Sequence, residues 1–163
     1  MHLLIGQAAT DYLVLGADWT FDGGGACFAS RVQPMAGSDP GEVSRTFFQA
    51  YADGDREKAA SLLAEDVIAY VTNAEGGVDE VAGRDAYMSR VPDLQEAGGS
   101  AEITQIVGVD EERAMTMVEI SVPDRKGKSL HNHAAFLAKV ADGEIARLWM
   151  VEALPAYSDE FWS

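Results

Sequence analysis

The sequence predicts an α+β domain in which three N-terminal helices pack against one face of an antiparallel sheet. Helical periodicity dominates the stretch from residue 42 to about residue 97, and strand-like apolar runs separated by turns follow it. The clearest single signal is Asp142-Gly143 between two apolar runs, because a two-residue hairpin turn needs positive φ. Helices followed by an antiparallel meander are typical of the α+β class.

The first 41 residues differ from the rest of the chain. Short apolar runs, the triplet Gly23-Gly24-Gly25 and a stretch rich in Pro, Gly and Ser fit no single periodic element. We therefore expect residues 1–41 to be an irregular extension and residues 42–163 to be the folded domain. We also expect Met35 to be the natural start, with an over-extended reading frame before it, since the first regular helix begins only a few residues later.

Two amphipathic helices open the domain. The first has apolar side chains at helical spacing on one face: Val43, Phe47, Ala50 and Tyr51. Asp53-Gly54 ends it, and Asp55 is placed to cap a second helix that stops before Glu65-Asp66. Residues 67–72 then predict a strand, Gly76-Gly77 a loop, and residues 84–97 a third helix that ends at Gly98-Gly99.

The remaining residues predict a meander of four strands. The expected strands cover residues 101–109, 113–122, 129–140 and 144–153. In the third, alternation places Asn132 and Phe136 in the more apolar set, which we assign to the inner face under the helices, and His131 and His133 on the outer face. The last strand is apolar on both faces. We therefore expect a homodimer that buries the outer sheet face.

Composition narrows the choice of partners. The chain has 12 Lys and Arg against 27 Asp and Glu, and its net charge of −15 opposes nucleic acids and anionic membrane surfaces. Cys27 stands alone, so no internal disulfide can form, which fits a reducing compartment. No run of 18 apolar residues occurs. We expect a cytoplasmic protein with neither nucleic acid nor membrane as a partner.

Several short motifs follow one another along the domain. They are Phe47-Phe48, Ala52-Asp53-Gly54-Asp55, Leu62-Leu63-Ala64-Glu65-Asp66-Val67, Gly83-Arg84-Asp85-Ala86, Asp142-Gly143-Glu144-Ile145 before Trp149, and Leu154-Pro155-Ala156-Tyr157-Ser158-Asp159-Glu160-Phe161-Trp162. In order and spacing they resemble the SnoaL-like branch of the nuclear-transport-factor-two-like superfamily. The resemblance implies a cone-shaped α+β barrel with an apolar cavity between sheet and helices, usually dimeric through the outer sheet face. Members include polyketide cyclases and ketosteroid isomerases, which move a proton next to a carbonyl.

The catalytic residues that the resemblance implies are mostly missing here. The isomerase oxyanion tyrosine falls near Phe47, its base near Val71 and its second, protonated aspartate near Phe136, and all three are apolar. The cyclase acid falls at Ala153. Glu152, one residue earlier, points to the other face of a regular strand, although a one-residue bulge would turn it inward. We therefore assign no catalytic residue.

Six residues are expected to contact a ligand: Phe47, Tyr51, Val71, Asn132, Phe136 and Trp149. Asn132 comes first because it alone on the inner face of its strand can donate or accept a hydrogen bond, with a satisfied core amide as the equal alternative. Aromatic side chains at such spacing are more often plain core. The facing of Tyr70 and Glu119 stays open at this point.

His131-x-His133 is a further candidate, because two imidazoles at spacing two share a face and could bind a metal ion. The sequence offers no cysteine nearby and no evident third ligand, so we expect a polar cluster at the sheet edge or the dimer face instead. We expect neither a metal nor a cofactor.

The sequence thus predicts a SnoaL-like protein whose apolar cavity accommodates a small apolar molecule, with no specific activity assigned. One alternative is an isomerase-type or cyclase-type enzyme that moves a proton next to a carbonyl. The other is a non-catalytic dimeric interaction module, in which the cavity is only a core. The substrate is not named by any motif in the sequence.

Overall fold

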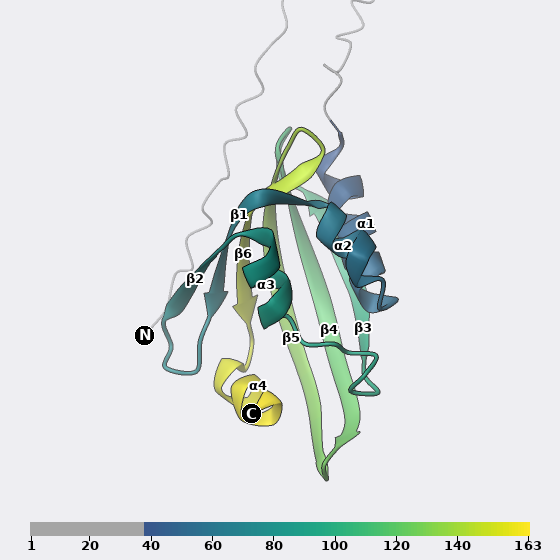
Figure 1. Ribbon diagram of the computed structural model, residues 1–163, viewed down its shortest axis with the longest axis vertical. Helices are drawn as coiled ribbons and strands as arrows, with labels where there is room; N and C mark the ends of the chain where they lie inside the picture. The colour runs from purple at the N-terminus through teal and green to yellow at the C-terminus, as the bar shows by residue number, and fades with distance from the viewer. Residues whose placement is uncertain (1–37) are drawn as a thin grey trace, which may run out of the picture. The chain divides into compact units, whose positions relative to one another are not determined.

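The computed structural model describes residues 38–163, which form four helices and one six-stranded sheet (Figure 1). In chain order the elements are α1 (Pro40–Ala52), α2 (Arg56–Ser61), β1 (Leu63–Thr72), β2 (Val78–Ala82), α3 (Arg84–Arg90), β3 (Ser100–Gly108), β4 (Arg113–Arg125), β5 (Lys128–Ala141), β6 (Glu144–Glu152) and α4 (Pro155–Trp162). Met35 and most of the expected extension lie outside the described residues. Within residues 38–163, no helix is long and apolar enough to cross a membrane.

The predicted α+β architecture is confirmed. The strand order is β2-β1-β6-β5-β4-β3, and four of the neighbouring pairs are antiparallel while β1 and β6 run parallel. Helices α1, α2 and α3 lie on one side of the sheet, and α4 follows β6 at one end (Figure 1). The sheet is not closed into a barrel, because β2 and β3 remain as its two edges.

The two N-terminal helices begin at acidic caps. The Asp39 carboxylate accepts a hydrogen bond from Gly41 N at 2.8 Å, and Pro40 occupies the first turn, where its missing N–H costs nothing. The Asp55 carboxylate accepts from Lys58 N at 3.0 Å and starts α2, as the sequence predicts. The apolar stripe of α1 packs on the sheet, where the Phe48 and Phe136 rings lie 4.6 Å apart between centroids.

Several elements differ from the sequence prediction, and β1 already begins at Leu63 rather than at residue 67. The third helix ends at Arg90 rather than near residue 97, because Pro92 forces Val91 into an extended conformation with ψ of 122°. The loop expected after residue 72 contains a short strand, β2, which pairs with β1 after a turn that includes Gly76 at φ of 79°. Its sequence Val-Asp-Glu-Val-Ala is too charged to read as a core strand, as suits a sheet edge.

The hairpin between β5 and β6 forms at the predicted turn. Asp142 and Gly143 both have positive φ, at 53° and 84°, which is the conformation of a type I′ turn. Next to the turn Val140 pairs with Ile145, but from Lys139, which pairs with Arg147, the register is displaced by one residue. This β-bulge reverses which side chains of β6 point inward beyond it.

The inner face of β5 is the one that the sequence predicts. Its buried side chains alternate along the strand: Leu130, Asn132, Ala134, Phe136, Ala138 and Val140. His131 and His133 between them are exposed. The core therefore lies between this face and the helices, and the space that it leaves open defines the site described next.

Candidate functional site

A pocket with a volume of about 380 Å³ lies between the inner face of the sheet and helices α1, α3 and α4. Its apolar wall includes Phe47, Tyr51, Val71, Met88, Phe136 and Met150. These side chains come from two helices and three strands that are far apart in sequence. Only the folded domain brings them together.

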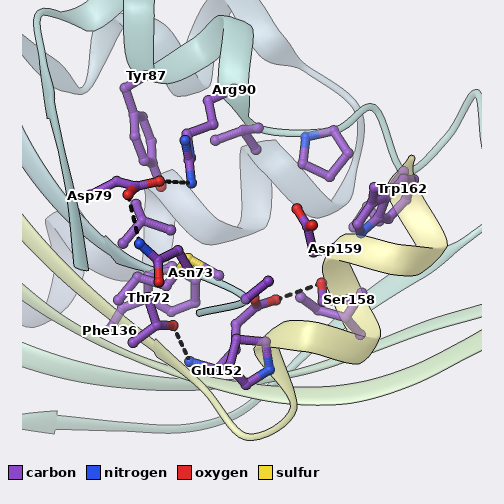
Figure 2. Close-up of a pocket in the computed structure, with 18 of the residues that line it drawn as sticks. Thr72, Asn73, Asp79, Tyr87, Arg90, Phe136, Glu152, Ser158, Asp159 and Trp162 are labelled. Atoms are coloured by element: carbon purple, nitrogen blue, oxygen red, sulfur yellow. Dashed lines mark hydrogen bonds and ion pairs between the residues drawn. The ribbon is translucent and has the colours of Figure 1, made fainter. Parts of the chain in front are cut away.

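One end of the pocket is polar (Figure 2). Asp79 on β2 accepts a hydrogen bond from Asn73 Nδ2 at 2.8 Å and forms an ion pair with Arg90 on α3 at 2.6 Å. The hydrogen bonds from Asn73 and Arg90 hold the pKa of Asp79 below its usual range. The Arg90 charge is therefore already neutralised, which leaves little free positive charge to attract an anionic ligand.

Glu152 is a second acidic side chain at this polar end. Its side chain is half-buried, and its Oε1 accepts a hydrogen bond from Ser158 Oγ on α4 at 2.9 Å. Its backbone N donates to Thr72 Oγ1 at 3.1 Å, which fixes the end of β6 against β1. Burial raises the pKa of Glu152, and the nearby Asp159 charge adds to this, although the Ser158 hydrogen bond opposes it.

Two tyrosines complete the wall. Tyr51 donates a hydrogen bond from its hydroxyl to the carbonyl oxygen of Pro92 at 2.9 Å. Burial raises the pKa of both Tyr51 and Tyr87, so both hydroxyls stay protonated at neutral pH. A ligand in the pocket would therefore meet neutral phenols beside Glu152.

Four of the six residues expected to contact a ligand line the pocket: Phe47, Tyr51, Val71 and Phe136. Asn132 does not. It is buried and fully engaged, because its Oδ1 accepts from Leu154 N at 3.2 Å and from His133 N at 2.9 Å while its Nδ2 donates to the Leu154 carbonyl at 3.3 Å. It is the satisfied core amide that the sequence left as the alternative, and it attaches β5 to the segment before α4.

Trp149 does not line the pocket either. It lies on the outer face, where its ring stacks on Tyr70 with centroids 5.8 Å apart. The bulge in β6 is the reason: Met150, not Trp149, pairs with Phe136 and points inward, and Glu152 pairs with Ala134. The inward bulge considered for Glu152 is thus present. The sequence contains the apolar Ile145 and Leu148 three residues apart, and the structure buries both, which a regular strand does not allow.

Sequence reasoning missed most of the polar residues of the pocket: Thr72, Asn73, Glu75, Asp79, Tyr87, Arg90, Ser158 and Asp159. Asn73 and Asp79 belong to the unpredicted β1–β2 hairpin. Arg90 and Ser158 lie on short helices whose packing no local pattern specifies.

We expect the free energy of unfolding to depend less on pH in Glu152→Gln than in the wild type. Because the pKa of Glu152 is raised above its ordinary 4.5, the folded state holds this proton more tightly than the unfolded chain. Between the ordinary and the raised pKa, the wild type should lose stability as the pH rises, and the variant should lose less. Urea unfolding at several values between about pH 4 and pH 8 measures this. Glu80→Gln, on the opposite face of the sheet, should keep the wild-type profile; identical profiles for Glu152→Gln and wild type would contradict the assignment.

Solved structures share this fold. Bal32a from a soil-derived mobile gene cassette is 19% identical, with 75% of this chain and 95% of that chain covered at a TM-score of 0.65. TerC, crystallised with polyporic acid, is 15% identical. The match covers 77% of this chain and 100% of TerC, with a TM-score of 0.61. A candidate ketosteroid isomerase from Kribbella flavida DSM 17836 is 19% identical. The match covers 71% of this chain and 78% of that chain, with a TM-score of 0.56. At these identities the likeness shows the fold alone.

No curated protein matches the sequence. The family comparison is more direct, because the SnoaL-like domain matches residues 44–148. This match spans most of the domain described above, from α1 to β6. The chain therefore belongs to the SnoaL-like family.

Proposed function

We propose that this protein binds a small, largely apolar molecule in the pocket between the sheet and helices α1, α3 and α4. The observation that carries the proposal is the pocket itself, which combines a volume of about 380 Å³ with an apolar wall and a set of polar side chains that includes Asp79, Glu152 and Ser158. Ligand sites typically have volumes of roughly 300–1,000 Å³ and a few polar groups that fix orientation. A core filled by its own side chains would leave no such space.

The polar end indicates which part of a ligand would lie there. Glu152, with its raised pKa, can donate a hydrogen bond to a carbonyl when protonated or accept one from a hydroxyl when ionised. The Arg90 charge is paired with Asp79, so a carboxylate or phosphate finds no free cation at that point. We therefore propose a neutral ligand that carries a carbonyl or hydroxyl at one end.

A substitution that fills the pocket should abolish binding of a neutral apolar probe. We expect N-phenyl-1-naphthylamine to fluoresce strongly with the wild type and at least about tenfold more weakly with Met150→Trp, because Met150 points into the pocket. Val78→Trp is the matched control, since Val78 is exposed on edge strand β2 and does not line the pocket. Equal probe titrations for the two variants would contradict the proposed site.

The second candidate function is proton transfer next to a carbonyl, and the position of Glu152 favours it. A half-buried carboxylate with a raised pKa, facing an apolar pocket, suits a general acid or base. Two of the family's catalytic positions are Phe47 and Val71 here, and a third is Phe136, so Glu152 with Ser158 would act without the usual oxyanion partner. A SnoaL-like fold does not decide the question, because function depends on the site.

Deuterium exchange tests this candidate. We expect the wild type to accelerate exchange of the acidic C1 protons of 2-tetralone in heavy water, followed by NMR, and Glu152→Gln to lose about a hundredfold of that acceleration or more. Glu80→Gln, which lies on the outer face of β2, should retain the wild-type rate. Equal exchange rates for wild type and Glu152→Gln would contradict the proton-transfer candidate, and ligand binding would remain as the proposed function.

We also propose that a second copy of the chain covers the apolar part of the outer sheet face. Two cross-strand rows there are almost entirely apolar. They are Met117, Ala135 and Val151 in one row, and Met115, Leu137, Trp149 and Tyr70 in the next. Met115, Met117 and Val151 are more than 40% exposed, which is unusual for neighbouring large apolar side chains in a monomer. A two-fold axis through this surface would bury both copies of it at once.

A charge in the centre of this surface should separate the copies. We expect Met117→Lys to shift the protein towards monomer in sedimentation equilibrium, because burying an unpaired lysine is strongly unfavourable. Val78→Lys replaces another exposed apolar residue, on edge strand β2, and should leave the association unchanged. A wild type that is monomeric at all concentrations would overturn the proposal.

For location and other partners, our proposal rests on composition. The single cysteine, Cys27, favours the cytoplasm over an oxidising compartment, and the net charge of −15 disfavours nucleic acids and anionic membranes. A small apolar molecule and a second copy of the chain are therefore the partners that we propose.

A further inference from the structure

The outer sheet face carries a polar cluster next to its apolar rows. Glu119 on β4 lies opposite His133 on β5, and His131 is the next outward residue of β5. His131 and His133 are exposed and Glu119 is half-buried, so solvent reaches all three. The sequence alone left the facing of Glu119 open, and the strand register now places it beside both imidazoles.

The three side chains are close enough to share one ion. One ligand atom from each lies within 4.8 Å of the others, His131 Nε2 and Glu119 Oε1 are 2.6 Å apart, and the two imidazole rings are 5.2 Å apart between centroids. In a tetrahedral zinc site, bonds of about 2.0–2.1 Å place ligand atoms roughly 3.4 Å from one another. Rotamer shifts of about an ångström in these exposed side chains are sufficient to reach that spacing.

The kinds of ligand define the kind of ion. Two imidazole nitrogens and one carboxylate oxygen suit zinc and its transition-metal neighbours, whereas calcium and magnesium prefer oxygen ligands only. The hydrogen bond between Glu119 and His131 accounts for two of the three groups and leaves His133 without a role. A shared ion accounts for all three.

Further negative charge lies on the same face. Glu102 on β3 is paired with Glu119 across the sheet and is also exposed, so both carboxylates point to the same side. Together with the net charge of −15, this row attracts cations to the cluster. Glu102 is also placed to supply a fourth ligand, directly or through water.

We propose that Glu119, His131 and His133 form a binding site for one divalent transition-metal ion of the zinc class on the outer face of the sheet. The site is independent of the pocket, because these side chains lie on the opposite face of β4 and β5 from Phe136 and its neighbours. It fastens two adjacent strands together, so that binding also stabilises the folded state.

The test is a titration of the full chain, without an affinity tag and after chelator treatment, with zinc chloride in excess magnesium. Isothermal calorimetry should give one ion per chain, with a rise in melting temperature at saturation. His131→Gln and His133→Gln should each weaken zinc binding by at least about tenfold. Ser121→Ala is the matched control, because Ser121 lies opposite His131 on the same face and supplies no ligand to the cluster.

The binding measurements on the variants decide whether the proposed metal site is correct. Saturable binding that is weakened in both histidine variants and kept in Ser121→Ala supports the site, and cobalt(II) in place of zinc should then show absorption bands of a nitrogen and oxygen site that the histidine variants lose. No saturable binding overturns the proposal. Equal binding by the histidine variants and Ser121→Ala also overturns it, since the ion would then be held elsewhere on the acidic surface. The substitutions are at solvent-accessible positions, and thermal unfolding without metal checks that each variant folds.

Discussion

One extra residue in β6 decides what each face of this sheet presents. Next to the Asp142-Gly143 turn the hairpin has the register that a two-residue turn imposes, and beyond the bulge every side chain of β6 has changed face. A regular hairpin would place Trp149 opposite Phe136 in the pocket and Glu152 on the outside. The bulge instead supplies the pocket with Met150 and an acid, and gives the outer face an aromatic ring that stacks on Tyr70.

Glu152 places an acidic side chain beside the apolar wall of the pocket. Phe47 and Val71, to which the family resemblance assigns the oxyanion and base groups, are hydrophobic, and polar side chains lie instead where β1, β6 and α4 meet. There Ser158 donates to Glu152, and Asp79 is held by Asn73 and Arg90. One fold can carry different arrangements of polar groups, so the fold alone does not specify the chemistry of this pocket.

The fold was largely predictable from the sequence, and the site only in part. Local signals such as the Asp55 cap, the Asp142-Gly143 turn and the alternation around Phe136 depend on neighbouring residues, and the structure agrees with each of them. Glu152 depends on a bulge, and strand alternation cannot be carried across one. The polar end and the Glu119 cluster arise from pairing between separate strands, which a single sequence does not specify.

The parallel pairing of β1 with β6 has a consequence for how the chain folds. Strands β3 to β6 are joined by short turns and pair with their sequence neighbours, whereas Tyr70 and Trp149 become partners across about 80 intervening residues. Loop closure of that length is entropically costly and slow relative to hairpin formation, so we expect the meander to form first and to act as the template on which β1 docks. The binding cavity would then be the last part of the domain to be assembled.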